Sequence, residues 1–178
     1  MIGLALRRAL ALGALLLPIA QPAAALDDAE QRALFAELEP CLTDAFRIAL
    51  DSKGAPARLR EMIPQYFNLA SVAAMKYGGA NFNRASNKGE LMDHAAAVLE
   101  EQIAENLWWY EGRAIRFNAA SLKEIRPKGR YSITGRVEGD EAFGLRVSRD
   151  GPMGCEIHAL FYGGLSIADV MNGQLIRY

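Results

Sequence analysis

The side chains best suited to acid–base, nucleophilic or metal chemistry are few in this chain of 178 residues. There are two histidines, His94 and His158, and two cysteines, Cys41 and Cys155. Neither histidine completes a set of metal ligands with the cysteines or with the other histidine. No Gly-x-Ser-x-Gly motif marks a serine nucleophile. The one pair that suits proton transfer is His158 with Tyr162, and we expect a protein that is not an enzyme and needs no metal or cofactor.

Two states are open for the cysteines. In an oxidising compartment, Cys41 and Cys155 form one disulfide, which closes a long loop and removes unfolded-state entropy worth about 4 kcal/mol. Otherwise they are two buried free thiols, because Cys is among the most buried residue types. A bridge requires that their Cα atoms come within bridging distance, and the sequence does not show whether they do.

The first 25 residues indicate export. Arg7 and Arg8 precede an apolar run over residues 9–17, and the segment ends in proline and three alanines at 22–25. This pattern is typical of a secretory signal peptide with a small-residue cleavage site near Ala25. The run is shorter than the roughly 20 apolar residues that span a bilayer. The mature chain is therefore expected to begin near residue 26.

Residues 26–178 have the length of a single domain with one core. Loss of Arg7 and Arg8 with the signal leaves 18 basic and 21 acidic side chains, a net charge of −3. A weakly acidic protein has no electrostatic reason to hold a phosphate backbone, so nucleic acid is not an expected partner.

The elements that position these residues are predicted to be helices first. Apolar residues recur at a spacing of four between residues 28 and 52, which indicates one stripe of an amphipathic helix: Leu34, Leu38, Leu42, Phe46 and Leu50. Pro40 is expected to interrupt it, because proline removes a helical hydrogen bond and clashes with the preceding turn. The prediction is a short leading helix and a second helix over about 40–51.

Three more helices are predicted. One begins at Pro56 and is broken or bent at Pro64, and a short one covers 68–77 and stops at Gly78. The longest covers 87–107 with Ser86 as its cap. Its expected buried face consists of Leu91, Ala95, Val98, Leu99, Gln102, Ile103 and Leu107.

Strands follow after Gly112. Four segments with stretches of alternation are separated by hairpin-length turns: 114–125, 130–138, 142–149 and 155–162. They predict an antiparallel meander. In the last strand, alternation places Ile157, Ala159 and Phe161 on one face and His158, Leu160 and Tyr162 on the other. The sequence therefore predicts one α+β domain with N-terminal helices packed on a C-terminal four-stranded antiparallel sheet.

Several features occur in a recognisable order. Residues 67–73 read as a phenylalanine, a polar residue, an apolar residue and small residues, and Tyr77, Gly78, Phe82 and a long amphipathic helix follow. Residues 156–167 combine a strand with a glycine, apolar, serine, apolar turn. With the signal peptide, this order resembles the periplasmic phospholipid-shuttle proteins, the MlaC-like toluene-tolerance family of ABC-transporter auxiliary components.

The resemblance covers about residues 40–175 and implies a function. It implies a periplasmic lipid carrier in which helices and sheet pack as in cystatin-like and nuclear-transport-factor-2-like domains. It also implies partners, namely a phospholipid or other apolar ligand, an inner-membrane ABC transporter complex and an outer-membrane lipoprotein complex. A dry pocket suits such a ligand, since each acyl CH₂ removed from water gains about 0.8 kcal/mol.

Candidate pocket residues are the large apolar side chains at the junction of helices and sheet. For each of them, ordinary core packing is the competing interpretation. The candidates are Phe67, Val72, Met75, Phe82, Leu99, Ile103, Leu107, Trp108, Tyr110, Phe117, Leu145, Leu160, Tyr162, Leu165 and Ile167.

Two further surface features are open to two interpretations. Three consecutive aromatic residues at 108–110 mark either a pocket mouth or membrane contact, or a cluster that caps the helix. Basic residues crowd the first two strands and meet either lipid headgroups or solvent: Arg113, Arg116, Lys123, Arg126, Lys128, Arg130 and Arg136.

The chain departs from the family after Ser166, because only about a dozen residues remain where these carriers continue into another helix. If that helix walls the cavity, the pocket here is smaller or more open. A ligand-free periplasmic interaction module of the same fold is therefore the alternative function.

Overall fold

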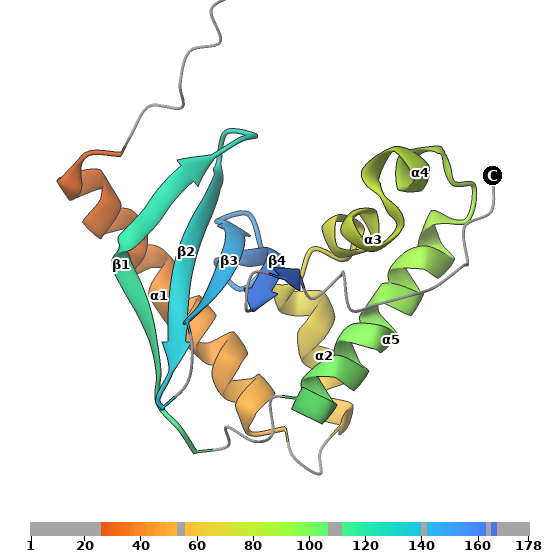
Figure 1. Cartoon of the computed structure of the whole chain (residues 1–178), viewed down its shortest axis with the longest axis horizontal. Coiled ribbons are helices and arrows are strands. Elements are labelled where there is room, and N and C mark those ends of the chain that lie inside the picture. The colour runs from red at the N-terminus through yellow and green to blue at the C-terminus, as the bar shows by residue number, and fades with distance from the viewer. Residues whose placement is uncertain (1–25, 53–55, 107–111, 140–141, 163–164, 167–178) are drawn as a thin grey trace, which may run out of the picture.

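The computed structural model describes residues 26–52, 56–106, 112–139, 142–162 and 165–166. Within these ranges the helices come first and the strands second (Figure 1), which confirms the predicted α+β fold. The helices are α1 (Asp28–Leu50), α2 (Pro56–Tyr66), α3 (Leu69–Tyr77), α4 (Gly79–Arg84) and α5 (Lys88–Asn106). The strands are β1 (Ile115–Ile125), β2 (Arg130–Val137), β3 (Ala142–Ser148), β4 (Glu156–Tyr162) and β5 (Leu165–Ser166). None of the described helices is long and apolar enough to cross a membrane.

Helix α1 begins at a capping box, in which the Asp27 carboxylate accepts from the backbone of Ala29 and Glu30. It then continues through Pro40 to Leu50, so the predicted division into two helices is wrong. Pro40 lies on the exposed face, where its missing N–H leaves the opposing carbonyl open to water. The buried stripe on the other face runs unbroken past it, and this packing outweighs a local cost of about 3 kcal/mol.

The other helices match their predictions more closely. Pro64 lies inside α2, near its end, and α3 begins after Asn68, whose side chain accepts from the Ser71 amide. Gly78 ends α3 at a φ of 83°. The six-residue α4 is not predicted, because its sequence has neither a side-chain cap nor an apolar period.

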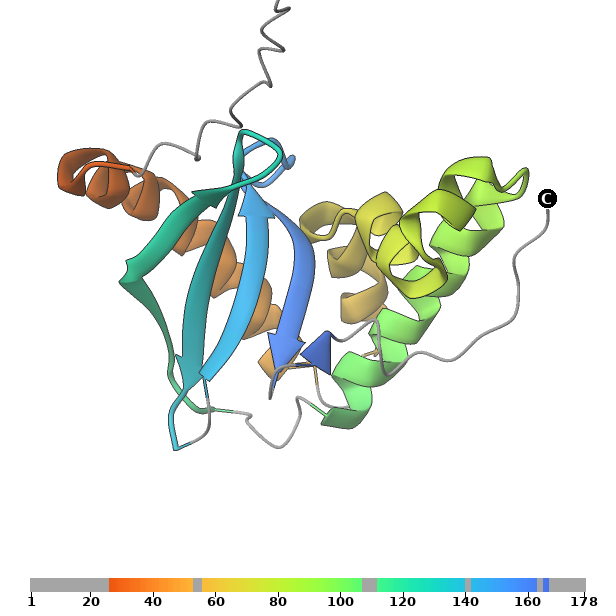
Figure 2. The same cartoon turned by 45° about the horizontal axis from the view of Figure 1, so that its top comes forward.

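The strands form one antiparallel meander in the order β1-β2-β3-β4-β5, as predicted except for the short β5. Figures 1 and 2 show α1 lying across one face of this sheet, while α3, α4 and α5 stand beyond the β4 edge. Helix α2 lies between the two parts, contacting α1, α5 and β4. The helices therefore make two separate layers beside the sheet.

A β-bulge in β4 changes which side chains face the helices. Arg146 pairs with Ala159, but the next residue of β3, Val147, pairs with Ile157, so His158 is the extra residue. Ile157 and Leu160 consequently face the same apolar junction. The prediction that alternation puts them on opposite faces is wrong, because alternation holds only along an unbroken pleat.

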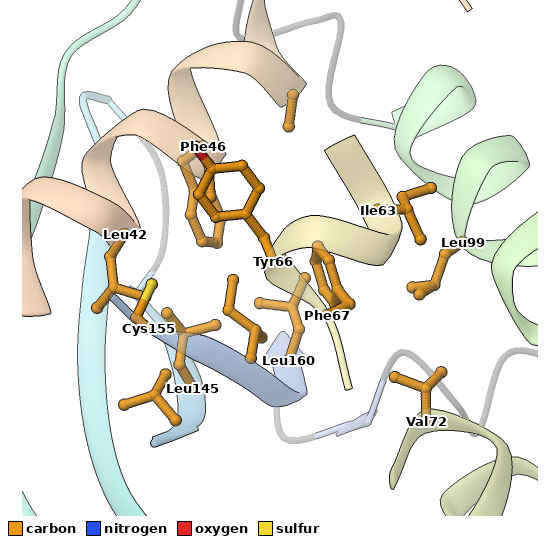
Figure 3. Packing of buried hydrophobic residues seen from close by; sticks show 14 of the residues in the cluster. Leu42, Phe46, Ile63, Tyr66, Phe67, Val72, Leu99, Leu145, Cys155 and Leu160 are labelled. Atoms are coloured by element: carbon orange, nitrogen blue, oxygen red, sulfur yellow. The ribbon is translucent and has the colours of Figure 1, made fainter. Parts of the chain in front are cut away.

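The core lies between α1 and the sheet face that α1 covers. The Phe46 ring stacks on Phe143 with centroids 4.9 Å apart and meets Phe117 edge-on at 5.8 Å. Gly135 lies against the Phe143 and Phe117 rings, and its missing side chain leaves room for them. Figure 3 shows how the core continues from Leu145 and Leu160 on the sheet, past Phe67, toward Leu99 on α5.

The structure contains a disulfide between Cys41 of α1 and Cys155, the residue before β4. Their Cα atoms lie 5.9 Å apart, within the usual range for a bridge. Of the two states open from the sequence, this is the bridged one. It fixes α1 to β4 across 114 positions of the chain.

Candidate functional site

An open cleft of about 740 Å³ separates the α3–α4 layer from the sheet face that α1 leaves uncovered. One wall comes from the helices and the floor from β2, β3 and β4. Its lining residues are Asn68, Ala70, Ser71, Ala74, Met75, Gly78, Gly79, Phe82, Asn83, Arg130, Arg146, His158 and Ala159. The volume is in the range of small-ligand sites, which usually measure about 300–1,000 Å³.

The helical wall is largely apolar. Ala70 and Ala74 are one helical turn apart on α3, so they form a smooth strip beside Met75. Phe82 of α4 extends this wall. Because alanine has only a methyl group and glycine has no side-chain carbon, the wall leaves space in the cleft that larger residues would fill.

The floor of the cleft is cationic. In the β2–β3 register, Arg130 is opposite Ser148 and Arg146 is opposite Ser132, so the two arginines are diagonal neighbours on one face. The Arg146 guanidinium lies over the Phe161 ring, 5.0 Å from its centroid. Both side chains line the cleft.

The bulged residue His158 links the floor to the wall. Its Nδ1 lies 3.0 Å from Ser71 Oγ on α3, and its Nε2 lies 2.9 Å from Ser148 Oγ on β3. The Glu156 carboxylate lies 3.6 Å from the same Nε2 and accepts a hydrogen bond from Asn68 Nδ2 at 3.0 Å. The N-terminal end of α3 is thus hydrogen-bonded to β4 through side chains.

Burial lowers the pKa of His158, and the Arg130 guanidinium lowers it further, against the opposing charges of Glu156 and Asp150. The imidazole is therefore neutral at pH 7. A neutral imidazole has one donor and one acceptor nitrogen, and a hydroxyl can partner either of them. Whether His158 pairs with Tyr162, the one pair that suits proton transfer in the sequence, is not tested, because the Tyr162 side chain lies outside the described residues.

The second histidine belongs to a different cluster. His94 Nδ1 lies 2.5 Å from the Tyr77 hydroxyl, between α5 and α3. Burial lowers the pKa of His94, and the charge of Lys76 lowers it further. Among the described residues, no three His, Cys, Asp or Glu side chains gather closely enough to hold a metal ion.

The apolar junction between the sheet and the helices is nearly filled. A void of about 10 Å³ remains among α1, α2, α5 and β4. This volume is about that of one water probe, so no acyl chain fits there as the side chains now stand. Four candidate residues line the void: Phe67, Leu99, Ile103 and Leu160.

The other candidates are distributed as follows. Met75 and Phe82 line the open cleft, whereas Val72, Phe117 and Leu145 are buried in the core away from both spaces. Leu107, Trp108, Tyr110 and Ile167 lie outside the described residues, as do the side chains of Tyr162 and Leu165. The first 25 residues also lie outside them.

Several lining residues are not among the sequence candidates. Arg130 is one of the basic residues noted on the first two strands, but Arg146, Ser71 and Asn68 are not singled out. The predicted strands already carried a signal for Arg146. Counting register back from the turn between β2 and β3 puts Arg146 on the same face as Arg130.

Comparison with known proteins adds information on the fold. No family model and no curated protein matches the chain. Among solved structures, it is similar to a phospholipid-binding protein from Ralstonia solanacearum that was determined in complex with a phospholipid, with a TM-score of 0.57. The two sequences are 13% identical, and the match covers 76% of this chain and 80% of that one. At this identity the likeness establishes a shared fold.

Proposed function

We propose that this protein binds a phospholipid and that an acyl chain of the lipid lies against the apolar wall of the open cleft. The observation that carries the proposal is the cleft itself, which is large, open to solvent and largely apolar along α3 and α4. The likeness to a phospholipid-binding protein of the same fold supports it.

The energetics favour an aliphatic ligand on that wall. Each methylene taken out of water contributes about 0.8 kcal/mol, so even a partly covered chain is held. Met75 adapts its shape to chains of different length, since its side chain is unbranched and flexible. Ala70 and Ala74 let the chain approach the helix backbone closely.

The wider role that we propose follows the sequence resemblance. The protein is exported, loses its first 25 residues, and acts in the periplasm as a soluble carrier. There it passes phospholipid between an inner-membrane ABC transporter complex and an outer-membrane lipoprotein complex. The disulfide suits this location, because such bonds persist in oxidising compartments.

The alternative is a ligand-free interaction module. The nearly filled junction around Phe67, Leu99 and Leu160 favours it, because an internal pocket for acyl chains is absent from the part of the junction that the structure describes. On this view the open cleft receives a segment of a partner protein. The two functions differ in whether the purified protein extracts lipid from a membrane.

A vesicle experiment distinguishes them. The protein is incubated with vesicles of equal parts phosphatidylglycerol and phosphatidylcholine that carry a radiolabelled lipid, and the label is measured on protein separated by gel filtration. The test variant is Ala74→Trp, which fills the cleft from its helical wall. The matched control is Ala97→Trp, on the exposed side of α5 and outside the cleft.

We expect the wild-type protein and Ala97→Trp to carry label, and Ala74→Trp to carry at least about tenfold less. Thermal melting of both variants checks that they are folded. Failure of the wild-type protein to take up any label would favour the interaction module. Equal uptake by Ala74→Trp and wild type would show that lipid binds somewhere other than this cleft.

A further inference from the structure

The cleft floor carries a charge pattern that holding an acyl chain does not require. Arg130 and Arg146 are diagonal neighbours on adjacent strands, and both side chains line the same cleft. An aliphatic chain gains nothing from a guanidinium, since its binding comes from apolar area removed from water. The two arginines therefore indicate that the ligand also has a polar part.

Within the described part of the chain, no acidic side chain forms an ion pair with the two arginines of the floor. No Asp or Glu is among the described residues that line the cleft, and none of the described carboxylates is within ion-pair distance of either guanidinium. Glu156, on the adjacent strand β4, directs its carboxylate to Asn68 and His158 instead. This local excess of positive charge occurs in a chain whose formal net charge is −1.

The position of Arg146 also favours anion binding. Packing over the Phe161 ring limits the rotamers of Arg146, so less side-chain entropy is lost when an anion is bound. The guanidinium plane offers parallel N–H donors that match two oxygens of a phosphate. Two guanidinium groups at diagonally neighbouring positions on adjacent strands can bind one phosphodiester between them.

We propose that Arg130 and Arg146 bind the headgroup phosphate and make the cleft selective for phospholipids with a net negative headgroup. This inference rests on the proposed lipid binding in the same cleft. A zwitterionic headgroup such as phosphocholine brings a cation next to the two guanidinium groups, and the like charges repel each other. Phosphatidylglycerol carries no such cation and keeps the full attraction.

The experiment compares two lipids that have the same dioleoyl chains. The full-length protein is equilibrated with vesicles of phosphatidylglycerol and phosphatidylcholine in equal parts, separated from them, and the bound lipid is identified by mass spectrometry. The test variant is Arg130→Gln/Arg146→Gln. The control is Arg116→Gln/Arg136→Gln, which removes two charges from a directly paired position on β1 and β2 outside the cleft.

We expect wild type and the control to favour phosphatidylglycerol by about tenfold or more, and the test variant to bind the two lipids within about threefold of each other. In 0.5 M salt, the wild-type preference should shrink, because exposed charges are screened over a few ångströms. An absence of preference in wild type, a full preference in the test variant, or an equal loss in the control would overturn the inference while leaving lipid binding in place. If wild type binds neither lipid, the proposed function fails, and the inference fails with it.

Discussion

Ser71 Oγ lies 3.0 Å from His158 Nδ1, although the two residues are 87 positions apart. The contact joins the helical wall of the cleft to its floor, because Ser71 is on α3 and His158 is the bulged residue of β4. The other imidazole nitrogen, Nε2, lies 2.9 Å from Ser148 Oγ. The spacing between wall and floor therefore depends on a hydrogen-bonded imidazole at the base of the cleft.

Removal of the Ser71 hydroxyl tests this dependence. In Ser71→Ala, a nitrogen of the buried imidazole loses its partner, so the free energy of unfolding should fall by about 1–3 kcal/mol. Urea denaturation measures the change. Helix α5 begins at Lys88, two residues after Ser86, so the predicted cap at Ser86 is wrong. Ser86→Ala, at this exposed position, should change the stability by less than about 0.5 kcal/mol. Equal effects of the two substitutions would contradict a structural role for the Ser71–His158 contact.

The lowered pKa values of the two histidines should make the stability of the protein depend on pH. Burial lowers the pKa of both His158 and His94 in the folded protein below the ordinary value of 6.5. The unfolded chain therefore binds more protons than the folded one as the pH falls below 6.5, and folding is weakened. Stability from this source is fully present above pH 6.5 and is lost progressively as the pH falls toward the folded-state pKa values.

The measurement is the free energy of unfolding at several pH values between 5 and 7.5. His158→Gln removes one titrating group, and we expect a smaller loss of stability across this pH window than in the wild type, whatever its stability at pH 7.5. His94→Gln removes the other histidine with a lowered pKa, and we expect the same direction of change. A steeper loss in His158→Gln than in wild type would show that His158 is not held neutral in the folded protein.

The disulfide predicts a large effect of reduction. Cys41 and Cys155 close a loop with a sequence separation of 114, for which the chain-entropy model gives a stabilisation of about 4–5 kcal/mol. Cys41→Ala/Cys155→Ala should unfold at a much lower urea concentration than the oxidised wild type. Reductant should lower the wild-type midpoint and leave that of the double variant unchanged. A reductant-insensitive wild type would mean that the two thiols are not joined.

Gly135 and Gly144 form a matched pair for packing against aromatic rings. A Cβ at Gly135 would overlap the Phe143 ring and lie 3.0 Å from Phe117 Cδ1, whereas one at Gly144 would rest 3.8 Å from Phe161 Cβ. Gly135→Ala should therefore cost about 1–3 kcal/mol of stability, the usual range for an overpacked core. Gly144→Ala should cost less, because its contact is an ordinary one. Thermal or urea unfolding compares them, and equal losses would argue against close packing of Gly135 on the Phe143 and Phe117 rings.

Much of the fold could be predicted because its signals are local. The four main strands are separated by turns of hairpin length, and such turns leave few ways to pair them other than an antiparallel meander. The prediction failed at Pro40, where tertiary packing of the stripe through Leu38 and Leu42 overrides a local helix breaker. It also failed at His158, because one inserted residue reverses the faces of the strand and leaves no mark in the apolar pattern.

The site was less accessible to sequence reasoning. Large apolar residues such as Val72 and Leu145 fit a pocket and a core equally well by composition, and the structure buries both in the core. Of the apolar candidates, only Met75 and Phe82 line the cleft, and most of its other lining residues are small or polar, so they do not stand out in a search for large apolar side chains. Only the packing of α3 opposite the sheet brings Ala74 and Arg146 to the same space.

The most direct test of lipid binding is native mass spectrometry of the protein purified without detergent after expression in a bacterium, followed by extraction and identification of any bound lipid. If the cleft binds phospholipid, the measured mass should exceed that of the polypeptide by one phospholipid, and Ala74→Trp should lose this added mass. A protein mass without added lipid, which also stays unchanged after incubation with phosphatidylglycerol vesicles, would rule out lipid binding in the cleft and leave the interaction module as the better explanation.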